Sequence, residues 1–139
     1  IYLNKSDFPF VHDLNRFLDL GHALQILSAG DKHALGQLVF AQVMTYLPLK
    51  AFSRMVQARR AQHKVKDFSC LDQFLALSFA QLTARESLRD IEINLRVQRQ
   101  HFYHLGFRCK TISRNTLANA NRVRPWQVFA DLAHHLIGV

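Results

Sequence analysis

From residue 35 onward, apolar side chains recur at the three- and four-residue spacing of an amphipathic helix. No stretch alternates polar and apolar residues as a half-buried strand does. A first helix is predicted to end at Leu47-Pro48, because the residue before a proline is driven out of the α region, and a shorter helix follows over 49–56. Ser69 then precedes the almost continuously apolar run 70–82, which predicts a central buried helix. We therefore expect an all-α, compact multi-helix bundle.

Three further helices are predicted: the first is capped by Thr83 or Ser87, and the other two begin near Ser113 and Pro125, all residue types that favour helix starts. Gly106 marks a turn between the first two of them. The predicted inward residues are Leu88, Ile91, Ile93 and Leu95 in the first helix, and Trp126, Phe129, Leu132, Ala133 and Leu136 in the last. Segment 87–121 thus has a helix-turn-helix layout, in which the second helix of the pair enters the DNA major groove.

The charge of the chain is strongly positive and unevenly distributed. Eighteen Lys and Arg against ten Asp and Glu give a formal net charge of +8. Residues 1–36 hold three bases and four acids, for a net charge of −1, whereas residues 37–139 hold fifteen bases and six acids, for +9. Such a field attracts polyanions, and nucleic acid is the leading candidate, with ribosome surfaces and acidic membranes as alternatives.

The polar helix after Ser113 carries side chains suited to reading DNA, because Arg can bridge guanine, Asn can bridge adenine, and Thr can contact a phosphate or a thymine methyl group. The candidate base-reading residues are Arg114, Asn115, Thr116 and Asn119, and the candidate backbone contacts are Arg122, Arg124, Arg85 and Arg89. The alternative is a solvated helix in an ordinary bundle. For the arginines on the helix that precedes this polar helix, and for those just before it, the alternative is an exposed helix face whose charge is partly neutralised by neighbouring acids. The basic segment 59–66 is either a backbone-contacting arm or a solvated loop.

The residues do not point to catalysis or to a metal site. Cys70 and Cys109 have no nearby cysteine partner, and neither a Cys-x-x-Cys nor a His-Glu-x-x-His motif occurs. There is also no glycine-rich phosphate loop and no nucleophile elbow. We expect no enzyme activity, no cofactor and no small-molecule substrate for this chain.

Two runs of the chain, 68–74 and 79–92, resemble the N-terminal domain of bacterial insertion-sequence transposases. The family is insertion sequence 4, in the subgroup whose N-terminal domain is catalogued as being of unknown function. Three further segments resemble the same domain in the same order: 39–44, 103–108 and 113–121. Leu47-Pro48 belongs to the match of the first segment, and Trp126 and 129–131 belong to the match of the last. The resemblance covers about 37–139, whereas residues 1–36 do not match.

The resemblance implies a part in DNA transposition, a form of DNA recombination carried out by mobile elements. In full-length members this helical domain precedes an RNase H-like domain whose Asp-Asp-Glu carboxylates hold two Mg²⁺ ions for strand cleavage and transfer. None of those catalytic residues is carried over to this chain, so Mg²⁺ is expected only in the missing domain. The helical domain is expected to recognise the terminal inverted repeats of the element. We interpret 37–139 as this domain, and 1–36 as an extension upstream of the natural start or as part of a truncated element.

The partners expected for this chain are double-stranded DNA and a second copy of itself. The alternative to DNA reading is a helical dimerisation module, because transposases act as dimers on paired ends. The helical stripe that would then meet a partner chain consists of Leu35, Leu38, Val39, Val43 and Tyr46. A third possibility is a fragment that inhibits the intact transposase. No secretory signal and no membrane-spanning run occur in the sequence, which predicts a cytoplasmic, nucleoid-associated bacterial protein without membrane contact.

Overall fold

The computed structural model describes residues 40–62 and 66–138. The extension 1–36 and three residues of the predicted stripe, Leu35, Leu38 and Val39, lie outside the described residues. Every regular element in the described part is helical, without a strand, which confirms the all-α prediction. After a helical segment at 40–45, the elements are α3 (Leu49–Ala58), α4 (Cys70–Leu82), α5 (Leu88–Val97), the 3-10 helix η2 (Arg99–His101), α6 (Arg114–Val123) and α7 (Gln127–Ile137). No helix of the described part is long and apolar enough to cross a bilayer.

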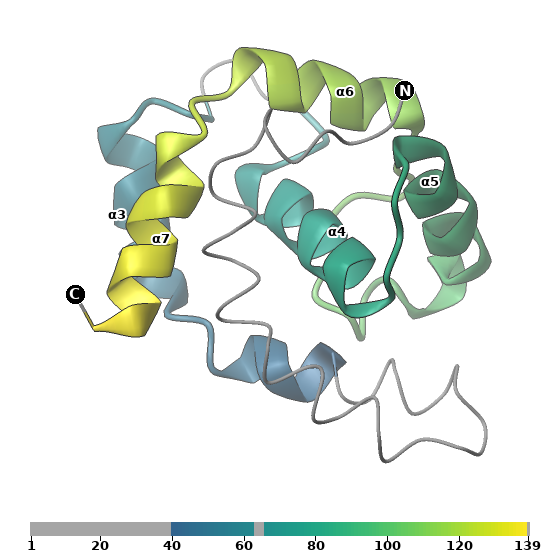
Figure 1. The fold of residues 1–139 in the computed structure, drawn as a ribbon, viewed down its shortest axis with the longest axis horizontal. Helices are drawn as coiled ribbons and strands as arrows, with labels where there is room; N and C mark the ends of the chain where they lie inside the picture. Colours follow the sequence, from purple (N-terminus) through teal and green to yellow (C-terminus); the bar gives the residue numbers. More distant parts are fainter. Residues whose placement is uncertain (1–39, 63–65, 139) are drawn as a thin grey trace.

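Helix α4 lies at the centre of the bundle, as its apolar run predicts (Figure 1). It begins with a capping box, in which the Ser69 hydroxyl accepts from the backbone N–H of Asp72 and the Asp72 carboxylate accepts from the backbone N–H of Ser69. The ring of Phe74 stacks on that of Phe129, with 6.4 Å between centroids, and lies 5.8 Å from that of Phe52. These three rings join α4 to α3 and α7.

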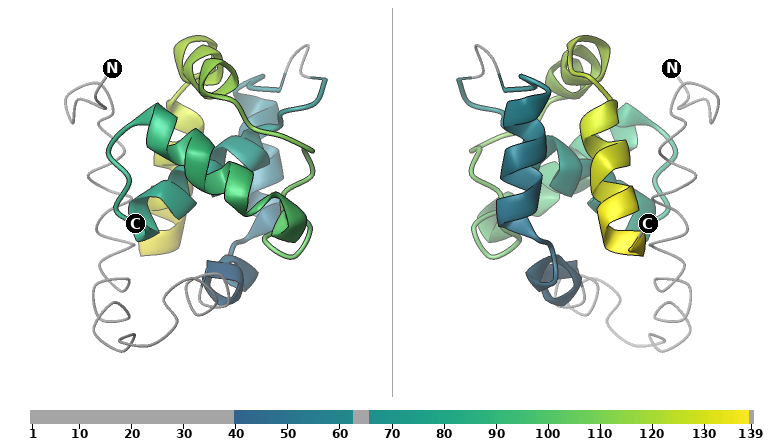
Figure 2. Two further views of the ribbon diagram at one scale, coloured as in Figure 1. Left: turned by 90° about the vertical axis from the view of Figure 1, so that its right-hand side faces the viewer. Right: turned by 90° about the vertical axis from the view of Figure 1, so that its left-hand side faces the viewer.

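The other helices surround α4. Helices α3 and α7 lie side by side along one flank, as the views in Figures 1 and 2 agree. An ion pair at 2.9 Å between Arg59 and Asp131 ties the end of α3 to the middle of α7. Helix α5 covers the opposite flank of α4, and α6 crosses the top of the bundle at its periphery (Figure 1). A long polar helix surface is therefore presented at one edge of the molecule.

Helices α5 and α6 do pack on each other, as the helix-turn-helix layout predicts, but their connection differs from that motif. A helix-turn-helix joins its two helices by a turn of about three to four residues, whereas here 98–113 intervene and include η2. The connection cannot be short because its apolar side chains fill the core beside α4: Phe102, Leu105, Phe107, Cys109 and Ile112 are all buried.

Two of the residues predicted to face inward are exposed, and so is Tyr46 of the predicted stripe. Ile93 is 48% exposed, because it lies two residues after Ile91 and so about 200° around the helix from that buried side chain. Trp126 is 45% exposed, because it precedes the first turn of α7 as its N-cap residue. Tyr46 is 82% exposed, so the predicted stripe is not core at its C-terminal end. The buried residue of that region is instead Phe40, whose ring meets Phe79 edge-on at 5.6 Å.

Candidate nucleic-acid interface

Helix α6 begins at Ser113, as the sequence predicts. The Ser113 hydroxyl accepts from the backbone N–H of Thr116 at 3.1 Å and is 2.9 Å from the Thr116 hydroxyl. Leu117 and Ala120 are the buried residues of the helix and pack it onto the bundle. The rest of the helix surface is free to carry polar side chains, and no acidic residue occurs in it.

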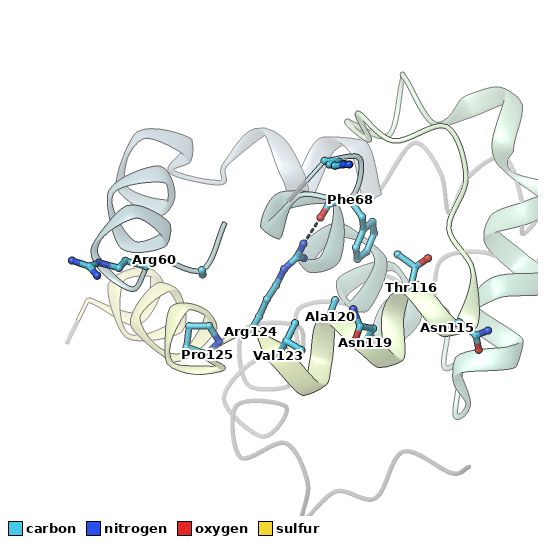
Figure 3. Close-up of a pocket in the computed structure, with 11 residues that line it drawn as sticks. Arg60, Phe68, Asn115, Thr116, Asn119, Ala120, Val123, Arg124 and Pro125 are labelled. Carbon is cyan, nitrogen blue, oxygen red and sulfur yellow. Dashed lines mark hydrogen bonds between the residues drawn. The ribbon is translucent and has the colours of Figure 1, made fainter. Parts of the chain in front are cut away.

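A groove of about 650 Å³ runs along α6, between that helix and the segment that leads into α4 (Figure 3). Three of the four predicted base-reading residues, Asn115, Thr116 and Asn119, line it. The lining also includes Arg60 and Lys66, from the basic segment that precedes α4; in the view of Figure 3 the Arg60 guanidinium lies beyond Pro125 and points away from the α6 residues. The remaining lining residues are Ala61, Phe68, Ala120, Val123, Arg124 and Pro125, so every charged residue of the described lining is basic.

Arg124 lines this groove next to Pro125, and its guanidinium is hydrogen-bonded to other residues of the protein. Its guanidinium donates to the backbone oxygen of Phe68 (Figure 3), to that of Ser69 at 3.0 Å, and to Gln73 Oε1 at 2.8 Å. It also lies over the Phe68 ring, 5.4 Å from the centroid, and burial lowers the pKa of this side chain. The sequence suggested Arg124 as a phosphate contact, whereas the structure gives it a structural role, because three of its five N–H donors already have protein partners.

A buried polar network continues from Arg124 and fixes α6 on α4. The side-chain amide of Gln73 donates to Asn121 Oδ1 at 2.7 Å while its oxygen accepts from Arg124. Next to it, the buried Asp72 carboxylate accepts from the backbone N–H of Arg108 at 2.8 Å, which anchors the connection before α6. The position of α6 is therefore set by hydrogen bonds as well as by apolar packing.

The other predicted contact residues lie outside the groove lining. Arg122 is exposed and donates to Asn119 Oδ1 at 3.0 Å, which leaves the amide N–H groups of Asn119 free of described partners. Arg114 is exposed, about 100° around the helix from Asn115. Arg89 is exposed on α5. Arg85 is half-buried, and its Nε is inaccessible to solvent and has no partner among the described residues.

Two basic residues of the groove, Arg60 and Lys66, were not among the predicted contacts. The signal for them was present as the run of bases over 59–66, which is equally typical of a solvated loop. Only the fold shows that this segment lies opposite α6, because the two are distant in sequence. Residues 63–65 of the run lie outside the described residues.

No acid is among the described residues that line the groove, although the exposed Asp67 lies between the lining residues Lys66 and Phe68, and several other acids already have partners. Asp131 is paired with Arg59, Glu92 is 3.1 Å from Arg96, and Asp72 is buried with backbone partners. The alternative given for the arginines of α5 was an exposed face partly neutralised by acids, and the pair of Arg96 with Glu92 is an instance of it. The positive charge around α6 is not offset in the same way.

Neither cysteine thiol of the described part is exposed at the surface, where it could react with another molecule. Cys70 and Cys109 are both buried and free. Burial, together with the charge and hydrogen bond of nearby Asp72, raises the pKa of the Cys109 thiol to about 12. Within 40–62 and 66–138, no group of three or more His, Cys, Asp or Glu side chains is arranged to hold a metal ion.

Comparison with known proteins identifies the family of the chain. Residues 35–108 match the family described as a domain of unknown function, DUF4372. The match covers the helical segment at 40–45, α3, α4, α5 and most of the connection that follows, and it ends before α6. No match was found among curated proteins or among solved structures. Because the match spans more than half of the 139 residues, the chain belongs to the DUF4372 family.

Proposed function

We propose that this chain is a double-stranded-DNA-binding domain of a transposase, of the insertion sequence 4 family, and that it recognises the terminal inverted repeats of its element. The observation that carries the proposal is the exposed polar face of α6, which borders a groove whose charged described lining is entirely basic. Family membership supports it, since DUF4372 domains are common in transposase-like proteins. The proposed role is binding, and strand cleavage is assigned to a separate Asp-Asp-Glu domain.

The dimensions and side chains of α6 suit the DNA major groove. The helix has ten residues and is roughly 15 Å long, and the groove of B-DNA, about 12 Å wide, admits one helix. Asn115 and Asn119 are four residues apart and so lie on one face, where each amide can pair with an adenine edge. Arg122 follows on the same outer side, about 60° from Asn119.

Fluorescence anisotropy tests this proposal. The full chain is titrated with a labelled duplex carrying the terminal repeat of its element, with a scrambled duplex, and with an RNA duplex of the repeat sequence. We expect tight binding to the repeat that weakens steeply with salt, since bound cations release counterions from the phosphates. RNA should bind less well, because its major groove is too deep and narrow for a helix. Absence of duplex binding at low salt, or a preference for RNA, would contradict the proposal.

The double variant Asn115→Ala/Asn119→Ala locates the reading face. It should lose most of the preference for the repeat over the scrambled duplex, by about 1–3 kcal/mol for each lost base contact. Gln100→Ala removes an exposed amide from η2 and serves as the matched control. Equal preference in both variants and in the wild type would remove α6 as the reading helix.

A second candidate function is self-association through the segment before α3. Of the predicted stripe, Val43 and Tyr46 are described, the first half-buried and the second 82% exposed. An exposed tyrosine is a typical interface residue. Sedimentation velocity over a range of concentrations distinguishes the two functions. A chain that stays monomeric and still binds the repeat would support DNA binding and contradict self-association.

A further inference from the structure

We infer that the groove beside α6 holds one sugar-phosphate strand of the bound duplex, and that Arg60 and Lys66 contact its phosphates. This inference rests on the proposed function and specifies which surface attracts the DNA phosphates electrostatically. It assigns a binding role to two residues of the segment before α4.

The charge of the groove is uncompensated. Arg60 and Lys66 are both exposed, and neither forms an ion pair with a described residue. Arg59, the neighbour of Arg60, is by contrast paired with Asp131 at 2.9 Å. No acid is among the described lining residues, and the exposed Asp67, between the lining residues Lys66 and Phe68, is the acid nearest to them in the sequence.

The opposite wall offers neutral hydrogen-bond donors. Asn115, Thr116 and Asn119 carry amide and hydroxyl groups, and no described residue accepts from the amide N–H groups of Asn119. The two cations and the Thr116 hydroxyl, which can contact a phosphate, match a phosphodiester strand, while the Asn115 and Asn119 amides remain the groups proposed to read base edges. The groove follows α6 from Asn115 to Pro125, with Arg60 toward the Pro125 end (Figure 3).

The groove also has the length and the fixed position that a strand requires. Roughly 15 Å of α6 is long enough to run beside a short stretch of one strand. Arg124 ties the backbone of Phe68 and Ser69 to the end of α6, so the two walls are held at one separation. A preformed groove requires little ordering when DNA binds. A helix reading bases must have a phosphate strand beside it, and this groove is adjacent to the reading face.

The test measures the salt dependence of DNA binding by the full chain. Arg60→Gln and Lys66→Gln should each reduce the slope of log K against log salt by about one, on the repeat and on the scrambled duplex alike. The double variant should reduce it by about two, and Lys66→Arg should keep the wild-type slope. Arg54→Gln and Lys50→Gln, which remove exposed bases of the same types from α3, are the matched controls and should leave the slope unchanged.

The outcomes separate this inference from the proposed function. If the wild type binds the repeat but the groove variants shift the slope no more than the α3 controls, the phosphate strand lies elsewhere and the inference is overturned while the function stands. If the wild type binds no duplex, the proposed function itself fails. Thermal melts followed by circular dichroism should show unchanged folding for all variants, because every substituted side chain is exposed.

Discussion

At the scale of single residues, Arg124 is a charged side chain that stabilises the fold although it lines a basic groove. Its guanidinium donates to the backbone oxygens of Phe68 and Ser69, just before α4, and the Ser69 oxygen also accepts from the backbone N–H of Gln73. It also orients Gln73, which in turn holds Asn121 of α6. One side chain therefore joins the start of α4 to the end of α6.

Arg124→Met should lower the free energy of unfolding by about 2 kcal/mol, because charge-assisted hydrogen bonds are lost and two backbone oxygens lose a partner. Urea denaturation followed by circular dichroism measures the change. Arg122→Met is the matched control, since Arg122 is exposed and its described bond is to Asn119 on the same helix; it should change stability by less than about 0.5 kcal/mol. Equal effects of the two variants would show that the Arg124 contacts contribute nothing net.

At the scale of helices, the hydroxyl caps explain why the sequence locates the helix starts so well. Ser69, Ser87 and Ser113 each accept from a backbone N–H three residues on, as their positions predict. A cap is a local interaction, so it is visible in the sequence without knowledge of the fold. Asp72 differs, because it has a second partner in a distant part of the chain.

Asp72→Asn should cost about 2–3 kcal/mol of unfolding free energy. The carboxylate accepts from the backbone N–H and hydroxyl of Ser69 and from the backbone N–H of Arg108, all of them donors. An amide would lose the charge and turn an N–H₂ group toward one of these donors. Chemical denaturation checks this value against Asp67→Asn, which changes an exposed carboxylate and should be nearly neutral. A loss of stability no greater than that of Asp67→Asn would contradict the anchoring role.

At the scale of the whole molecule, one apolar core supports the entire surface that we assign to DNA. The rings of Phe52, Phe74 and Phe129 join α3, α4 and α7. The connection between α5 and α6 contributes further buried side chains, among them Phe102 and Phe107, whose rings stack at 4.7 Å. The position of α6 thus depends on packing far from its exposed face.

Phe74→Ala should lower the free energy of unfolding by about 3–5 kcal/mol, because it leaves a cavity where three helices meet. This is a large part of the roughly 5–15 kcal/mol that stabilises a domain, so the unfolding midpoint should fall steeply. Thermal and urea unfolding measure the loss. Tyr103→Ala removes an aromatic ring that is 86% exposed and should have little effect. A small loss for Phe74→Ala would mean that this packing is not the main source of stability.

The sequence by itself determined the helix starts, the central place of α4 and the all-α class, because helical periodicity and caps depend on residues within one or two turns of each other. It also placed Asn115, Thr116 and Asn119 on one polar helix. Tertiary structure alone decided that Arg60 and Lys66 lie across a groove from these residues and that Arg124 is held by the protein. These contacts join residues about fifty positions apart, and their formation depends on how the whole core packs, which no local pattern encodes.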